Sequence, residues 1–253
     1  MAIEIHPVTD ATGTFFTPLS GAFPQVPGAT WQRARELDAH AFVDDDTWRL
    51  RFRCYLIATG RHTILVDAGV GPAGAPAASW APVPGALPQE LTTVGIAPSD
   101  IDVVVLTHLH TDHVGWTVAP TAFGNARHVV QRIEHDAVTD LNPALRHSLL
   151  DPLRAAGQLD VIDGSASLAT GVRAQLAPGH TPGHQAVLVH QAGETVAITG
   201  NAFVHAVQVV DPSVAYRHES DPEAAYRTRL ALLQQADVLA TAHLTEPFLT
   251  PDR

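Results

Sequence analysis

The sequence predicts a single α/β domain in which strands and helices pack in layers. Its 253 residues are 45% hydrophobic and 16% charged, which is typical of a globular protein with a sizeable core. Short β-rich runs alternate with helical stretches along the chain, and that order predicts a layered architecture. No internal repeat and no long linker divides the chain, so we interpret residues 1–253 as one domain.

The strands are predicted from apolar or alternating runs that are bounded by turn residues. Residues 48–58 and 62–67 form two of them, joined by a tight turn at 59–61. An apolar strand follows at 102–106, and a short one lies near the C-terminus at 238–240. Further strands are expected at 127–131, 159–162, 172–177, 185–190 and 194–199.

Helices are expected near 86–95, 131–140, 144–155 and 221–236. The last one has a clear start, because Asp221 can cap the helix and Pro222 suits its first position. The segment from Gly71 to Pro88 is rich in Gly, Ala and Pro, which predicts a long surface loop. Loops of that length in compact domains are often functional, so we expect this one to form a pocket wall.

Charge and cysteine content narrow the function classes. The formal net charge of −11 argues against nucleic acid or an anionic membrane as the main partner. No apolar run approaches the ~20 residues that cross a bilayer, and the N-terminus lacks the features of a signal peptide, so we expect a cytoplasmic protein. Cys54 is the single cysteine, so a bound metal would be held by imidazole and carboxylate groups.

The most informative segment directly follows the apolar strand at 102–106. It carries His108, His110, Asp112 and His113. In an extended chain the side chains at i and i+2 point to one face, so His108 and His110 can bind one ion. The turn that follows brings Asp112 and His113 round to another. This one loop therefore offers ligands for two ions.

Two later segments add further histidines. Residues 178–184 read Pro-Gly-His-Thr-Pro-Gly-His, and the glycines and prolines fix a sharp turn that can push His180 into a cleft. We expect His184 to brace this turn. His243 follows the short apolar strand near the C-terminus.

Together these segments resemble the metallo-β-lactamase superfamily. The His-x-His-x-Asp-His motif stands at 108–113, the Gly-His-Thr-Pro-Gly-His motif at 179–184, and a C-terminal metal histidine at 243. Asp67 matches the early aspartate of the family, which supports the metal loop from behind the ligands. The resemblance covers most of the chain, from about residue 50 to residue 245.

The resemblance implies a four-layer αβ/βα sandwich with the site at one edge of two facing sheets. It implies a first zinc ion held by His108, His110 and His180, and a second held by Asp112, His113 and His243. A metal-bound water would be the nucleophile, because zinc lowers its pKa towards neutrality. We therefore expect a hydrolase with one or two Zn²⁺ ions, although iron or manganese also suits such ligands.

The sequence departs from the family at Asn201. Relatives usually end this strand in Gly-Asp, and that aspartate bridges the two metals, whereas this chain has Gly200-Asn201. A neutral amide can offer its carbonyl oxygen to one ion but bridges two poorly, so we expect a weakened second site. The chain is then a natural variant with one tightly held ion, a catalytically attenuated binding protein, or an engineered Asp-to-Asn form. We favour the hydrolase, because the five metal histidines and Asp112 remain.

The segment after Asn201 resembles the branch that contains methyl parathion hydrolase and related lactonase-like or arylesterase-like enzymes. Acyl-homoserine lactonases usually carry a tyrosine three residues after the bridging aspartate, and this chain has Val204 there. That difference favours other esters, lactones or phosphotriesters. A glyoxalase-like thioesterase and a mononuclear iron dioxygenase of the same fold are the remaining alternatives.

We expect the substrate to be a hydrophobic small molecule, because pockets of this kind are mostly apolar. The aromatic candidates for its pocket, each of which could instead pack in the core, are Phe15, Phe16, Phe23, Trp80, Trp116 and Phe203. Candidate catalytic residues are Asp112 and Asn201 at the metals, and His205, which either orients the substrate or is a structural histidine. The histidines at 128, 135, 147, 190 and 218 are expected on the surface or in packing. Relatives often pair, so a homodimer stays open, but no segment specifies an interface.

Overall fold

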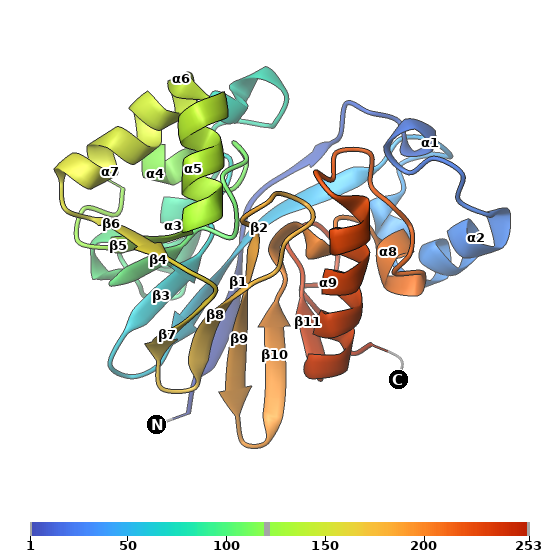
Figure 1. Cartoon of the computed structure of the whole chain (residues 1–253). Coiled ribbons are helices and arrows are strands. Elements are labelled where there is room, and N and C mark those ends of the chain that lie inside the picture. The colour runs from blue at the N-terminus through green and yellow to red at the C-terminus, as the bar shows by residue number, and fades with distance from the viewer. Residues whose placement is uncertain (1, 119–121, 252–253) are drawn as a thin grey trace.

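Two six-stranded sheets face each other in the computed structural model, which describes residues 2–118 and 122–251 (Figure 1). The first sheet consists, in spatial order, of β1 (Glu4–Thr14), β2 (Arg49–Ala58), β3 (Thr63–Val66), β4 (Val103–Val105), β5 (Arg127–Gln131) and β6 (Leu159–Ile162). The second consists of β12 (Phe248–Leu249), β11 (Val238–Ala240), β10 (Glu194–Ile198), β9 (Gln185–Gln191), β8 (Val172–Leu176) and β7 (Ser165–Ala169). Helices lie on the outer faces of both sheets, which confirms the predicted four-layer αβ/βα sandwich.

Side-chain alternation along the strands explains the layers. In β3, Ile64 and Val66 pack between the two sheets, whereas Leu65 points to the other face and packs under the helices. In β9, Val187 faces the first sheet, and Leu188 packs against the long helix α9 (Pro222–Gln235). Strands that are buried on both faces read as continuous apolar runs, which is why these strands were visible in the sequence.

The helices are mostly short. Besides α9 they are α1 (Leu19–Ala22), α2 (Gly28–Leu37), α3 (Leu87–Thr93), α4 (Gly115–Val118), α5 (Arg132–Leu141), α6 (Pro143–Leu145), α7 (Asp151–Ala155) and α8 (Ala206–Val210). The helix predicted at 144–155 is divided, because a π-helical turn at Arg146–Leu150 separates α6 from α7. Asp221 caps α9 as predicted, with its carboxylate accepting hydrogen bonds from the N–H groups of Glu223 at 3.1 Å and Ala224 at 3.0 Å. No helix among the described residues is long and apolar enough to span a membrane.

The sequence did not predict the strands β1, β7 and β12 or the helices α1, α2, α4 and α8. β1 is an edge strand that pairs with β2 over its whole length, with a register shift between Thr9 and Ala11. It is polar and contains Pro7 and Gly13, so its pattern resembles a loop. Its buried Asp10 accepts hydrogen bonds from the N–H of Val70 at 2.6 Å and of Leu87 at 2.7 Å. This carboxylate thereby ties the edge strand to both ends of the loop at 71–88.

The candidate site lies where the carboxyl ends of parallel strands meet. β3 pairs in parallel with β4, and β10 pairs in parallel with β11. The loops that follow these four strands carry Asp67, the histidine motif, Asn201 and His243. The buried guanidinium of Arg53 on β2 donates to the carbonyl of Thr241 at 2.8 Å and to that of Leu244 at 2.9 Å. Arg53 therefore fixes the chain on both sides of His243.

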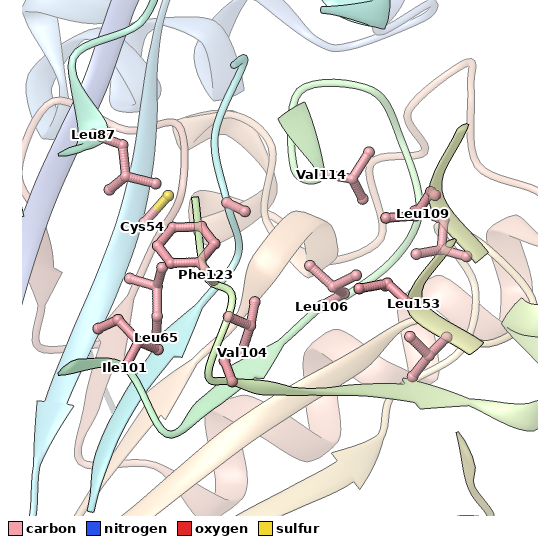
Figure 2. Packing of buried hydrophobic residues seen from close by; sticks show 14 of the residues in the cluster. Cys54, Leu65, Leu87, Ile101, Val104, Leu106, Leu109, Val114, Phe123 and Leu153 are labelled. Atoms are coloured by element: carbon pink, nitrogen blue, oxygen red, sulfur yellow. The ribbon is translucent and has the colours of Figure 1, made fainter. Parts of the chain in front are cut away.

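Apolar packing anchors the histidine loop from below. Leu106, Leu109 and Val114 flank or interrupt the motif, and all three are buried in one cluster with Leu153 of α7 (Figure 2). The apolar residues face the core, so the histidines between them are directed towards the sheet edge. The alternation of apolar and polar residues in this loop thus sets the direction of the ligands.

Candidate metal centre

Three histidines from two loops converge on one point. Nε2 of His108 lies 3.1 Å from Nδ1 of His110, and Nε2 of His180 lies 3.0 Å from the same His110 nitrogen. One ligand atom from each of the three residues lies within 4.8 Å of the other two. His108 and His180 are buried, whereas His110 is exposed, so the site opens to solvent on the His110 side.

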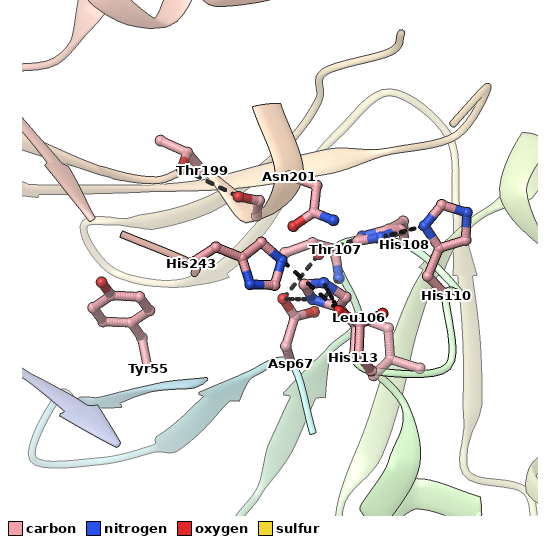
Figure 3. A network of polar contacts seen from close by, with 12 residues as sticks. Tyr55, Asp67, Leu106, Thr107, His108, His110, His113, Thr199, Asn201 and His243 are labelled. Atoms are coloured by element: carbon pink, nitrogen blue, oxygen red, sulfur yellow. Dashed lines mark hydrogen bonds and ion pairs between the residues drawn. The ribbon is translucent and has the colours of Figure 1, made fainter. Parts of the chain in front are cut away.

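Asp112, His113 and His243 form a second cluster beside the first. Oδ2 of Asp112 lies 3.2 Å from Nε2 of His113 and 3.8 Å from Nε2 of His243. The rings of His108 and His113 lie 4.1 Å apart between centroids, so the two clusters adjoin. Figure 3 shows His108, His113 and His243 around the space below Asn201. The structure thus brings together every histidine and the aspartate that the sequence analysis assigned to metal binding.

The donors and their spacing fit zinc. A tetrahedral zinc ion with bonds of about 2.0–2.1 Å places neighbouring ligand atoms about 3.3 Å apart. The separations of 3.0 Å within the first cluster and 3.8 Å within the second lie around this value. Nε2 of His113 is buried and lies 3.2 Å from Oδ2 of Asp112, so the two groups are placed to share one cation. Each cluster could offer three ligands to an ion, the number that catalytic zinc sites take from the protein.

Asp67 orients one ligand from behind. Its φ of 64° lies in the left-handed region, which a short polar residue tolerates. Its Oδ1 accepts a hydrogen bond from the N–H of Thr107 at 2.8 Å, and its Oδ2 lies 2.8 Å from Nδ1 of His113. His243 is held in the same way, with Nδ1 2.7 Å from the carbonyl oxygen of Arg51. In both histidines these contacts leave Nε2 directed at the centre.

Burial keeps most candidate ligands uncharged. It lowers the pKa of His108 and of His180 well below the ordinary value, and the neighbouring histidines add to the effect. Burial likewise lowers the pKa of His243 to about 4. Loss of hydration lowers the pKa of His110 to about 4 as well, although one side of its ring reaches solvent. These four imidazoles are neutral at pH 7, so each keeps a lone pair for a metal ion.

His113 and Asp112 form a charged pair instead. Burial would lower the pKa of His113, but the carboxylates of Asp112 and Asp67 outweigh that effect and raise it to about 10. Burial would raise the pKa of Asp112, yet the charge and hydrogen bond of His113 hold it below its usual range. A metal ion that binds this cluster must therefore displace the proton of His113.

Asn201 lies beside both clusters. Its Nδ2 lies 3.2 Å from Nε2 of His180, and its Oδ1 is buried without a hydrogen-bond partner among the described residues. The backbone N–H of Asn201 donates to Nε2 of His184 at 3.0 Å, and Nδ1 of His184 lies 2.9 Å from the carbonyl oxygen of Ala177. Both ring nitrogens of His184 are thus used, so His184 braces the turn and is not free to bind a metal.

Gly200 is required for this arrangement. Its φ is 48°, and a Cβ atom there would lie 2.7 Å from Nε2 of His184 and 2.8 Å from the side chain of Thr107. Only glycine allows the backbone to pass this close while it presents Asn201 to the site.

A cavity of 460 Å³ opens onto both clusters. Its floor is formed by four of the candidate ligands, His110, Asp112, His180 and His243, together with Asn201. Its apolar wall consists of Phe15, Phe16, Leu50, Trp80, Leu109 and Val204. Trp80, from the predicted loop, donates from Nε1 to Oγ1 of Thr111 at 3.1 Å and contacts Phe15 edge to face at 5.6 Å. Phe16 is 65% exposed and forms the rim. A larger cavity of 610 Å³ beside Arg61 and His190 contains no candidate metal cluster of the described residues.

Three of the predicted pocket aromatics do not line this cavity. Phe23 is buried and packs between Trp48 and Tyr216. Phe203 is fully buried in the core under α9. Trp116 packs on the core below the metal loop and donates from Nε1 to Oδ1 of Asp10 at 3.0 Å. The core-packing alternative holds for these three, because their backbone positions direct the rings away from the site.

His205 is the candidate catalytic residue that the structure does not bring to the cavity. Its ring is 1% exposed and lies among Phe23, Trp31, Phe42 and Trp48, with centroid distances between 4.9 and 5.8 Å. Nδ1 accepts a hydrogen bond from the N–H of Val207 at 3.2 Å and caps α8. Burial lowers the pKa of His205 to about 3, so this histidine is neutral and occupies a structural position.

Among the cavity residues that sequence reasoning missed, three lie in the loop between α8 and α9. They are Tyr216, His218 and Glu219. His218 was expected on the surface or in packing, and it is exposed but also lines the cavity. Burial raises the pKa of Tyr216, and the charges of Asp112 and Glu219 add to this shift. The sequence of this loop has no periodic pattern. The only signal in it that could have predicted a site is the presence of polar side chains such as Tyr216 and Glu219.

Comparison with curated proteins identifies relatives over part of their length. The chain is 31% identical over 149 residues to an N-acyl homoserine lactonase of a Bacillus species, covering 54% of this chain and 57% of that protein. It is 31% identical over 188 residues to metallo-beta-lactamase domain-containing protein 1 of Mus musculus, covering 72% of this chain and 60% of that protein. The chain therefore spans less than two thirds of the length of these relatives.

Solved structures share the fold over nearly the whole chain. The hydrolase AbOPH of the beta lactamase superfamily matches with a TM-score of 0.79 and 23% identity, covering 97% of this chain and 88% of that one. AidC, a dizinc quorum-quenching lactonase in complex with the product N-hexnoyl-L-homoserine, matches with a TM-score of 0.77 and 22% identity, covering 98% and 90%. Residues 53–243 match the family model of the metallo-beta-lactamase superfamily, and this range contains both ligand clusters. The chain belongs to the metallo-beta-lactamase superfamily.

Proposed function

We propose that this chain is a metal-dependent hydrolase that cleaves an ester, lactone or phosphotriester bond in a hydrophobic small molecule. The main support is the pair of three-ligand clusters that open onto one cavity with an aromatic wall. The relatives that are named as lactonases and hydrolases support the reaction class.

Zinc bound at either cluster would lower the pKa of a bound water towards neutrality and polarise the carbonyl or phosphoryl oxygen of the substrate. The chain supplies the geometry: the contacts of Asp67 and of the Arg51 carbonyl hold two ligands in fixed orientations. Asp112 and Asn201 reach both the clusters and the cavity, so they can orient the attacking water as well as the metal. No side-chain nucleophile is needed.

We infer that the two ions differ in affinity because of Asn201. The first cluster consists of three neutral imidazoles, and Asp112 is the one carboxylate among the six candidate ligands. Asn201 adds an amide but no charge, so one negative charge faces two divalent cations. The ion that binds first then repels the second, and we propose one tightly held zinc ion and one weakly held ion.

The cavity supports an apolar substrate. Phe15, Phe16 and Trp80 form a continuous aromatic wall, with neighbouring ring centroids 4.4 to 6.1 Å apart. Val204 lines the same cavity and adds apolar surface where acyl-homoserine lactonases usually have a tyrosine. An aryl ester, an alkyl lactone or an aryl phosphotriester can place its apolar group against this wall while its reacting bond lies over the clusters.

The test is turnover of a panel of aryl esters, lactones and phosphotriesters by the zinc-loaded chain, with zinc per chain measured on the same samples. We expect hydrolysis of at least one class, and loss of both activity and bound zinc in His108→Ala and His180→Ala. His190→Ala, which changes an exposed histidine outside both clusters, is the matched control and should keep both. Activity that survives in the two cluster variants would overturn the proposal.

Asn201 is also the observation that favours a second candidate, a binding protein with attenuated catalysis. The two candidates differ in one result. A binding protein retains zinc and binds hydrophobic ligands, but it hydrolyses no member of the panel. Iron in the purified protein together with oxygen uptake would instead support a dioxygenase.

A further inference from the structure

The loop between α8 and α9 brings a phenol to the candidate metal centre. Tyr216 is 5% exposed and lines the cavity. Its ring lies parallel to that of His180, at a centroid distance of 6.1 Å and an interplanar angle of 11°. The loop therefore places an aromatic side chain beside a candidate ligand.

The hydroxyl of Tyr216 has no hydrogen-bond partner within residues 2–118 and 122–251. Two other buried aromatic side chains, Trp48 and Tyr55, bond their polar groups within the chain. Trp48 donates from Nε1 to the carbonyl oxygen of Thr17 at 2.8 Å. The hydroxyl of Tyr55 donates to the carbonyl oxygen of Thr241 at 2.8 Å. Tyr216 lines the cavity, and its hydroxyl oxygen, unlike Nε2 of His205, is not sealed from solvent. The hydroxyl can therefore donate to a molecule bound in the cavity.

The loop holds Tyr216 rigidly. The fully buried guanidinium of Arg229 on α9 donates to the carbonyls of Pro212 at 2.7 Å and Val214 at 3.2 Å, and it forms an ion pair with Glu219. The N–H of Glu219 in turn donates to the carbonyl of Tyr216 at 3.0 Å. Residues on both sides of Tyr216 are thus fixed by one side chain. A donor held in this way needs little reorganisation when a charge develops nearby.

We propose that the Tyr216 hydroxyl donates a hydrogen bond to the substrate oxygen that gains negative charge as the bond is cleaved. This inference rests on the proposed hydrolase function and names a residue that positions the substrate for it. The phenol keeps its proton throughout, and water supplies the oxygen and hydrogen atoms that hydrolysis adds. Val204, on the neighbouring wall of the cavity, offers no polar group that could do the same.

The test compares Tyr216→Phe with the wild-type chain, both loaded with zinc. The substitution keeps the ring on His180 and removes only the hydroxyl. We expect kcat to fall by about 10- to 100-fold while KM changes by less than about threefold, because the hydrogen bond strengthens in the transition state. Tyr226→Phe is the matched control, since Tyr226 is exposed on α9 and does not line the cavity. A kcat of Tyr216→Phe within about twofold of wild type would overturn the proposal.

Two further measurements distinguish a failure of the Tyr216 proposal from a failure of the proposed hydrolase function. Phe23→Leu loosens the packing around Tyr216 but keeps its hydroxyl, so a loss of kcat through packing alone would appear there equally and would count against the hydrogen bond. Binding of phenylphosphonate to the zinc-loaded protein, by calorimetry, reports on the hydroxyl without turnover. We expect about 5- to 10-fold weaker binding to Tyr216→Phe. Equal binding and equal turnover overturn the role of Tyr216 alone, whereas a wild-type chain that neither hydrolyses the panel nor binds the phosphonate overturns both proposals.

Discussion

Restoring a carboxylate at position 201 tests the electrostatic account of the metal centre most directly. In Asn201→Asp the side chain keeps its size, and the new carboxylate adds one negative charge beside both clusters. The amide of Asn201 is 5% exposed and lies 3.2 Å from Nε2 of His180, so the added charge would sit at ligand distance and away from bulk water.

The magnitude follows from Coulomb's law. Two unit charges about 4 Å apart interact with about 4 kcal/mol at an effective dielectric constant of about 20. Part of this gain is lost, because the protonated His113 already stabilises the new carboxylate in the metal-free chain and gives up its proton when the ion binds. We therefore expect a net gain of about 2–3 kcal/mol for the second zinc ion, or about 30- to 150-fold tighter binding.

The assay is competition for zinc with a chromophoric chelator, which resolves the two dissociation constants. The matched control is Asn142→Asp, because Asn142 also lines the cavity and caps α6 through its side-chain oxygen, a bond that a carboxylate preserves. The control adds the same charge to the cavity but not to the clusters, so it should shift the second dissociation constant by less than about threefold. If Asn201→Asp shifts it no further than the control, the weakened-bridge reasoning is wrong.

Three more predictions concern the support of the site, its pocket and the pH dependence of folding. Asp67→Asn should weaken zinc binding by about 10- to 100-fold, because His113 loses the carboxylate that orients it, and unchanged affinity in the same competition assay would contradict this. Trp80→Ala should raise KM for a bulky aryl ester by about tenfold more than for a methyl ester, and an equal effect on both would exclude Trp80 from the binding wall. Burial lowers the pKa of His128 to about 4 from 6.5, so below pH 6.5 the unfolded chain binds this proton and the native chain does not. The free energy of unfolding should therefore fall by up to about 3 kcal/mol between pH 6.5 and 4, and urea titrations of His128→Gln should show a shallower fall.

The strands and the ligands of the histidine loop could be predicted because both depend on short-range patterns. The apolar run at 103–105 is buried on both faces, and His108 and His110 share a face through the two-residue repeat of an extended chain. His180 and His243 lie far along the chain from this loop. Their assignment as candidate ligands depended on the motif order of a known family, because no local sequence pattern predicts which distant turns lie together in the fold.

The edge strand β1 was not predictable, because its structure depends on long-range contacts and not on a short-range pattern. It is half exposed and polar, and its place in the sheet depends on pairing with β2 and on the bonds of the buried Asp10 carboxylate. Neither contribution is visible in the periodicity of residues 4–14. Long-range hydrogen bonds decided that this segment is a strand.

The motifs of the sequence, through the family that they resemble, determined the superfamily and the four-layer fold, and they predicted the six candidate ligands. Only the tertiary structure decided which of the other polar side chains face the cavity. His205 and His218 are the same residue type in neighbouring segments, yet His205 lies among four aromatic rings and His218 lines the cavity. Tyr216 reaches the cavity because Arg229, from a later helix, fixes its loop. Periodicity reports that a residue is buried or exposed, but what it faces depends on the element that packs against it.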